Sequence, residues 1–208
     1  MFAYHRFALS LRDVEDLLAE RGVPVSHETM RVWCAHYGPT FARRLRKHQP
    51  GAGDHWYLDE LHFATVRDER RVLWRAVYQD GDTLDILVQK RKDKQAALRF
   101  FRKLLKSEGR SPKRLTTDKL PSYGAAKREL MPSVPHCTNR YENNRAVVSH
   151  ERTRVRERQM RKFKSQGHPQ RFLAVHDRVQ NLFRLGWHLT SVVNCRILRH
   201  GRSWNGDR

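Results

Sequence analysis

The chain has 208 residues, which is enough for one sizeable core and a smaller second domain. Its 42 lysines and arginines outnumber 22 aspartates and glutamates, and the net charge of +20 indicates a polyanionic partner, nucleic acid before an anionic membrane surface. The sequence has no apolar run long enough to span a membrane and no signal peptide, and its three scattered cysteines are typical of a reduced cytosolic protein.

Two helices are predicted in the first 38 residues. LSLRDVEDLLAERG has apolar residues at helical spacing, and its Ser10 begins a motif that resembles a capping box. SHETMRVWCAHYG follows after a break at Gly22, with Ser26 as the expected cap. An ordinary helical hairpin fits this layout, and so does a helix-turn-helix. In the DNA-binding interpretation, the residues at the start of the second helix face the major groove: His27, Glu28 and Arg31.

The basic, Pro- and Gly-containing stretch FARRLRKHQPGAGD predicts a linker, with a domain boundary near Pro50–Gly53. Three strands are expected next, in HWYLDELHFATV, RRVLWRAVYQ and LDILVQ, with hairpin turns at 67–69 and 80–82. Then come a helix ending at Gly109, the short strand RLTTD, the helix PSYGAAKREL and a short strand within 134–138. Helices are expected over 143–164, 168–183 and 188–198. This order predicts an α/β fold with a mixed sheet.

Two aspartates occupy positions that are common in active sites. Asp59 lies inside the apolar strand WYLDELHF, and Asp118 lies where a short strand turns into a helix. By position alone, Asp59 is better explained as a solvent-facing residue of a half-exposed strand. If the two acids face one another, they form an oxygen-rich pocket suited to Mg²⁺ or Mn²⁺. Two such ions can activate a water or a 3′-hydroxyl for displacement at phosphorus, which fits a basic chain that acts on nucleic acid.

Several long motifs closely resemble the IS-six family of bacterial insertion-sequence transposases: HWYLDE, VLWRAVYQDGDTLDILVQKRKDKQAALRFFRKLL, TTDKLPSYGAAKREL, NNRA and RERQMRKFKSQGHPQRFL. The resemblance covers nearly the whole chain. It implies a ribonuclease-H-like domain with a DDE triad, in which Asp59 and Asp118 are the first two acids. It also implies a helix-turn-helix that binds terminal inverted repeats, so we expect domains at 1–50 and 54–165 and a C-terminal helical extension at 166–208.

The resemblance implies metal-dependent cleavage and transfer of double-stranded DNA, with Mg²⁺ or Mn²⁺ and two ions in an active enzyme. It implies a homodimer or larger oligomer bound to terminal repeats and target DNA, in the bacterial cytoplasm at the nucleoid. A protein of this kind that only binds DNA is the alternative. A general basic or RNA-binding protein fits less well, because it leaves the two strand-borne aspartates unexplained.

The chain departs from the family at the third triad acid. Family members read NNRAENSH or similar, and the position directly after NNRA is here Val147. Glu151, one helical turn further on, is the candidate substitute, and Glu142 is the next. A surface ion pair between Glu151 and a neighbouring arginine is the simpler explanation of that residue. Impaired activity is therefore expected. Family members also usually have a longer N-terminus than the nine residues before Ser10.

The positive charge increases along the chain. Residues 1–53 carry net +3, residues 54–135 net +6 and residues 136–208 net +11. Arginine at this density is suited to phosphate contacts. We expect DNA contacts beside the site from Lys119, Arg145, Arg152, Arg154, Arg156, Arg158, Arg161, Lys162 and Lys164.

Overall fold

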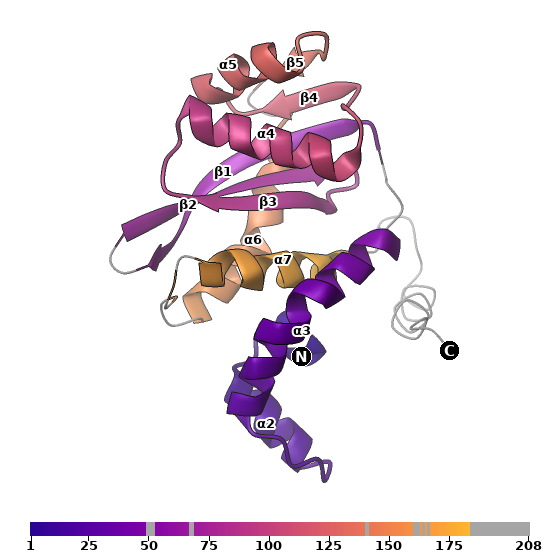
Figure 1. Ribbon diagram of the computed structural model, residues 1–208, viewed down its shortest axis with the longest axis vertical. Helices are drawn as coiled ribbons and strands as arrows, with labels where there is room; N and C mark the ends of the chain where they lie inside the picture. Colours follow the sequence, from indigo (N-terminus) through magenta and orange to yellow (C-terminus); the bar gives the residue numbers. More distant parts are fainter. Residues whose placement is uncertain are drawn as a thin grey trace.

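The computed structural model describes residues 1–48, 53–66, 69–139, 142–159, 163, 165 and 167–183, without the side chains of 48, 63–66, 145, 152 and 157–159. A mixed sheet with helices on both faces forms its centre, and a helical arm projects away from it (Figure 1). The described helices include none that is both long and apolar enough to cross a membrane. The predicted helix at 188–198 and the predicted turn at 67–69, apart from Glu69, lie outside the described residues.

Five strands form the sheet, in the order β3-β2-β1-β4-β5. They are β1 (His55–Val66), β2 (Glu69–Tyr78), β3 (Thr83–Gln89), β4 (Arg114–Thr117) and β5 (His136–Cys137). The first three are antiparallel neighbours, whereas β4 pairs in parallel with β1 and β5 in parallel with β4. This confirms the predicted α/β mixed sheet, and its strand order is the ribonuclease-H-like order that the resemblance implied.

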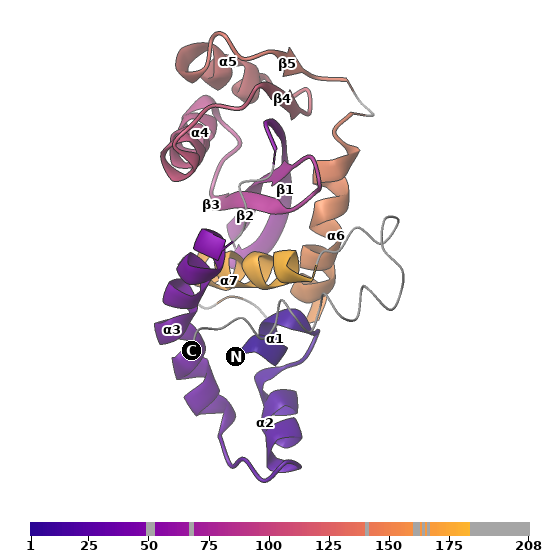
Figure 2. The same cartoon turned by 90° about the vertical axis from the view of Figure 1, so that its right-hand side faces the viewer.

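Helices cover both faces of the sheet (Figure 2). One face carries α4 (Lys94–Glu108) and α5 (Pro121–Leu130), and the other carries α6 (Asn144–Gln159) and α7 (Gly167–Leu182). Local sequence explains the ends of α4. The Asp93 side chain accepts a hydrogen bond from the Ala96 amide, and Gly109 ends the helix with a positive φ of 68°.

The largest apolar cluster lies between the sheet and the α4/α5 layer. Fully buried aromatic rings dominate it, contributed by β1, β2, α4 and α5: Trp56, Trp74, Phe100, Phe101 and Tyr123. On the opposite face, a smaller cluster joins Leu61, Leu73 and Ile86 to Phe172 and Leu173 of α7. Apolar side chains of the sheet are therefore buried on both of its faces.

The helical arm consists of α1 (Phe2–Arg6), α2 (Leu11–Ala19) and α3 (His27–His48). Ser10 and Asp13 form the predicted capping box, since each side chain accepts a hydrogen bond from the other's backbone amide. The linker prediction is wrong for FARRLRKH, because α3 continues through Pro39 to His48. Packing favours this continuation: Phe41, Ala42 and Leu45 contact the apolar side of α7.

The helix α7 joins the arm to the sheet. It contacts α3 and α1 on one side and β3 on the other. Gly38 allows the close approach of α3, because a Cβ at this position would lie 3.1 Å from the Val175 side chain. A boundary between residues 165 and 166 therefore does not describe this packing, because α7 is part of the layer that covers the sheet.

Candidate functional site

The parallel pairing of β1 and β4 brings three carboxylates together. Leu58 pairs with Thr117, so Asp59 and Asp118 follow directly at neighbouring positions of the two strands. One carboxylate oxygen from each of Asp59, Glu60 and Asp118 lies within 4.8 Å of the others. Among the described residues this is the one group of three potential metal-ligating side chains. The predicted meeting of Asp59 and Asp118 is thus seen in the structure, with Glu60 added.

The donor set fits a hard divalent cation. Mg²⁺ prefers oxygen ligands at about 2.1 Å in octahedral geometry, which places neighbouring ligand oxygens about 3 Å apart and opposite ones about 4 Å apart. The three oxygens within 4.8 Å of one another need only small side-chain adjustments to reach that spacing. Side-chain exposure is 15% for Asp59, so the cluster is open to solvent on that side.

Two of the three acids, Glu60 and Asp118, have a raised pKa, and burial is the main cause for both. Burial, followed by the nearby Asp118 carboxylate, raises the pKa of Glu60 to about 7, and the Lys92 ammonium opposes this shift. Burial also raises the pKa of Asp118, although the Leu120 amide donates to its Oδ1 at 3.1 Å. Clustered carboxylates of this kind favour a compensating cation.

The α6 helix packs against Asp59. The ring of His150 is 1% exposed, and its Nε2 lies 3.2 Å from Oδ2 of Asp59. Burial lowers the pKa of His150, which favours the neutral ring. About two helical turns before His150, the Asn143 side-chain amide donates to the Leu58 carbonyl oxygen at 2.8 Å. These contacts fix the rotation of α6 relative to β1.

A buried arginine holds α6 and α7 to the sheet. Arg75 is the cross-strand partner of Asp59, and it is 1% exposed. Its guanidinium donates to the Ser149 carbonyl oxygen at 2.5 Å, the Thr153 hydroxyl at 2.6 Å and the Asp177 carboxylate at 2.9 Å. This network orients the helix that carries His150.

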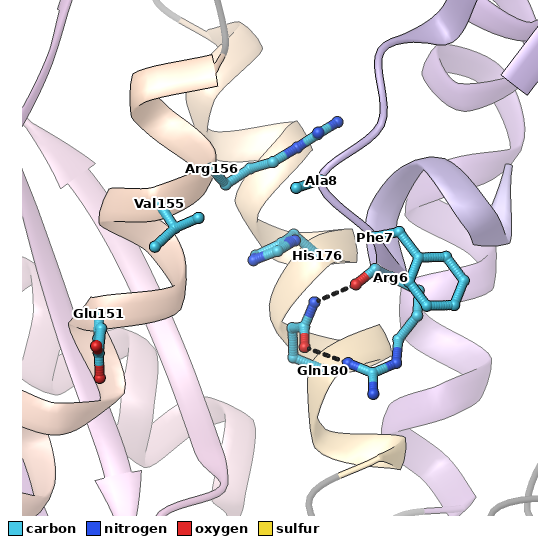
Figure 3. Close-up of a pocket in the computed structure, with 8 residues that line it drawn as sticks. All are labelled: Arg6, Phe7, Ala8, Glu151, Val155, Arg156, His176 and Gln180. Carbon is cyan, nitrogen blue, oxygen red and sulfur yellow. Dashed lines mark hydrogen bonds between the residues drawn. The ribbon is translucent and has the colours of Figure 1, made fainter. Parts of the chain in front are cut away.

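The candidate substitutes for the third acid lie elsewhere. Glu151 is exposed and lines a pocket of about 370 Å³ between α6, α7 and the Arg6–Ala8 segment (Figure 3). One residue after His150 is a rotation of about 100° on a helix, so Glu151 turns away from Asp59. Glu142 is also exposed, and it pairs with Arg114 at 3.1 Å near the other end of β4. The structure therefore does not bring either glutamate into the acidic cluster.

The residues predicted to face the major groove begin α3 and are partly exposed. Nδ1 of His27 lies 2.6 Å from Oε2 of Glu15, and the Arg31 guanidinium donates to Glu28 at 2.5 and 2.8 Å. These two pairs partly neutralise the charge at the start of α3. Their contact with DNA stays a prediction.

The predicted phosphate-binding residues do not share one environment. Lys119 and Arg154 are exposed. Arg156 is 4% exposed and donates to the Leu9 carbonyl oxygen at 2.8 Å, with its guanidinium 4.5 Å from the Tyr4 ring centre. The prediction that Arg156 contacts DNA is wrong for this arrangement, because the arm covers its charge. The structure describes only the backbone of Arg145, Arg152 and Arg158. Arg161, Lys162 and Lys164 lie outside the described residues.

Sequence reasoning missed Glu60 and His150. The signal for Glu60 was the pair of consecutive acids in WYLDELHF, because successive side chains of a strand point to opposite faces and a strand covered on both faces leaves neither acid fully exposed. His150 gave no such signal, since a histidine on a helix has many structural roles.

The strand order and the acidic site define a ribonuclease-H-like α/β protein with a candidate metal centre. A family model described as "DDE domain" matches residues 53–185. The transposase for insertion sequence-like element IS431mec of Staphylococcus aureus strain Mu50 is 33% identical over 158 residues, covering 74% of this chain and 70% of that protein. The transposase for insertion sequence element IS257 in transposon Tn4003, also from Staphylococcus aureus, has the same identity and coverage. The chain belongs to the IS-six family of DDE-type insertion-sequence transposases.

Two solved structures are more distant. The catalytic core domain of BIV integrase is 13% identical, covers 63% of this chain and 84% of that chain, and has a TM-score of 0.41. A chain of the simian T-cell lymphotropic virus intasome complex with PP2A regulatory subunit B56 gamma is 20% identical, with coverage of 51% and 39% and a TM-score of 0.40. The fold assignment rests on the strand order and the family match, not on these two likenesses.

Proposed function

We propose that this protein binds the terminal inverted repeats of an insertion sequence and catalyses metal-dependent DNA strand cleavage and transfer. The observation that carries the proposal is the pair of aspartates at the neighbouring parallel strands β1 and β4, whose carboxylate oxygens lie within 4.8 Å. Acids so placed in a chain of net charge +20 suit phosphoryl transfer on a polyanion.

Asp59 and Asp118 would hold Mg²⁺ or Mn²⁺, with two ions in the active complex. Bound ions supply the activation of a water or 3′-hydroxyl and the stabilisation of the leaving oxygen. The protein's own residues position this chemistry: the Leu120 amide orients Asp118, and His150 packs against Asp59. Exposed Lys119, next to Asp118, would contact a substrate phosphate.

Binding of double-stranded DNA is assigned to the arm and to the basic α6 region, and a homodimer or larger oligomer would hold two element ends together. We place the protein at the bacterial nucleoid on the same grounds. Affinity should fall steeply with salt, since each neutralised phosphate releases counterions and contributes about 0.9 to the slope of log K against log salt. A flat salt dependence would contradict DNA binding.

The experiment is a strand-transfer assay on duplex DNA that carries the ends of the encoding element, with Mg²⁺ or Mn²⁺. We expect transfer by the wild type. Asp59→Asn and Asp118→Asn should each reduce it by roughly a thousandfold or more, because several kcal/mol of charge stabilisation are lost. Both variants should bind the same DNA with nearly unchanged affinity.

A second candidate function is DNA binding without catalysis, and Val147 at the family's third acid position is the observation that favours it. In that case the wild type would bind the element ends but would not transfer strands, whether or not the two aspartates bind Mn²⁺. The strand-transfer assay, run beside a binding measurement on the same DNA, therefore separates the two functions.

A further inference from the structure

We propose that Glu60 supplies the third carboxylate of the metal site, in place of the glutamate that family members carry at the position of Val147. The inference rests on the proposed function, because it concerns the same metal ions. It assigns to β1 a role that the family motif gives to a residue of α6.

The geometry singles out Glu60 among the described acids. Its carboxylate oxygen lies within 4.8 Å of those of Asp59 and Asp118, whereas Glu142 is paired with Arg114 and Glu151 lines a different pocket. A cation that contacts Asp59 and Asp118 is thus within reach of Glu60 after small side-chain movements.

The burial of Glu60 is a second and independent observation. Its side chain is 3% exposed, and within the described part of the chain its Oε2 has no partner at hydrogen-bond geometry, although the buried Tyr123 hydroxyl interacts with the Glu60 carboxylate and opposes the rise of its pKa. Oε1 accepts from the Lys92 ammonium at 3.3 Å. A buried carboxylate oxygen without a hydrogen bond is unfavourable, because its lost hydration is not replaced. A divalent cation between the three acids would satisfy it.

The end of β4 explains how consecutive residues of β1 share one site. Successive side chains of a strand point to opposite faces, and Asp59 and Glu60 accordingly lie opposite Arg75 and Trp74 of β2. β1 pairs with β4 no further than Leu58. Beyond that pair the edge of β1 is free of β4, and side chains from both faces can approach Asp118.

A structural ion pair with Lys92 is the competing explanation of Glu60. It accounts for Oε1 but leaves Oε2 without a partner at hydrogen-bond geometry. The two explanations differ in what they predict for metal binding by the free protein. An ion pair alone would let the Glu60 charge act on Mn²⁺ only through space, so Glu60→Asp, which keeps the charge and shortens the side chain, would leave Mn²⁺ affinity unchanged.

The test is calorimetric titration of Mn²⁺ into the full chain, with thermal unfolding to confirm that each variant is folded. Glu60→Gln should weaken Mn²⁺ binding by at least about tenfold, since even outer-shell partners of metal ligands contribute that much. The matched control is Glu151→Gln, which removes an exposed carboxylate outside the cluster and should leave affinity unchanged. If Glu60→Gln does not fold, Glu60→Asp keeps the charge, shortens the reach and should also weaken binding.

Lys92→Met provides a second measurement. The ammonium and the cation compete for the same carboxylate, so this substitution should strengthen Mn²⁺ binding in the wild type and do so less in a Glu60→Gln background. Equal gains in both backgrounds would overturn the proposal, because Lys92 would then act only as a remote charge.

The outcomes separate this inference from the proposed function. Loss of Mn²⁺ binding in Asp59→Asn with wild-type binding in Glu60→Gln overturns the role of Glu60 and leaves the transposase proposal intact. A wild type that binds no Mn²⁺ overturns both. Val147→Glu should change strand transfer by less than about tenfold if the third carboxylate is already present. An inert wild type that gains transfer by orders of magnitude from Val147→Glu would also overturn the role of Glu60.

Discussion

The two faces of the sheet are buried by different kinds of contact, as the neighbouring residues Trp74 and Arg75 of β2 show. Trp74 and Arg75 of β2 stand back to back, opposite Glu60 and Asp59 of β1. Trp74 lies in the large apolar cluster under α4 and α5, whereas Arg75 lies in a hydrogen-bonded network with α6 and α7. Apolar packing thus holds α4 and α5 to the sheet, whereas hydrogen bonds and an ion pair orient α6 and α7 beside Asp59.

The largest effect on stability is expected on the apolar face. Trp74→Ala should lower the free energy of unfolding by about 4 kcal/mol, because it removes a fully buried ring and leaves a cavity. Urea denaturation of the variant against the wild type measures this. Val148→Ala, at a side chain that is 58% exposed, is the control and should change stability little. Equal losses in the two variants would show that the apolar cluster is not the main core.

On the polar face, the expected loss is reversible by a second substitution. Arg75→Met should lower the free energy of unfolding by about 3 kcal/mol, because it leaves the Asp177 carboxylate buried and unpaired. Arg75→Met combined with Asp177→Leu should recover most of that loss. A double variant as unstable as Arg75→Met would mean that the bonds to Ser149 and Thr153 matter more than the ion pair.

A pH dependence should come from the polar face and its contact with the arm. Burial lowers the pKa of His176 to about 4, and its Nδ1 lies 2.9 Å from the His5 carbonyl oxygen. The unfolded chain therefore binds this proton first as pH falls. Stability is full above about pH 6.5 and decreases down to about pH 4, by up to about 2 to 3 kcal/mol.

The measurement is urea denaturation at several pH values between 7 and 4. His176→Gln keeps a hydrogen-bond donor for the His5 carbonyl and should flatten the pH dependence. Burial also lowers the pKa of His5, to about 3, so some dependence should remain. An unchanged profile in His176→Gln would show that His176 does not titrate in this range.

The smallest effects should separate two nearby arginines of α6. Arg154 is exposed, so Arg154→Ala should leave stability unchanged and reduce the slope of DNA affinity against salt by about one. Arg156 is buried against Tyr4, so Arg156→Ala should lower the free energy of unfolding by about 1 to 2 kcal/mol. The salt slope in Arg156→Ala should stay that of the wild type. A reversed pattern would place Arg156 on DNA.

The order of the elements and the choice of Asp59 and Asp118 as candidate site residues could be predicted from the amino-acid sequence alone. The three strands, the capped α4 and the Pro-initiated α5 follow from period, caps and breakers, which act between residues close in the chain. The long family motifs located Asp59 and Asp118, and the structure brings the two side chains together where β4 ends beside β1.

Features that depend on contacts between distant segments could be seen only in the folded structure. Packing of Phe41 and Leu45 on α7 outweighed Pro39 and extended α3, and burial against the arm removed Arg156 from the DNA-facing set. The position of Glu60 depends on where β4 stops beside β1, which is a property of strand pairing. Local sequence does not predict such pairing, because the strands that pair are far apart in the chain.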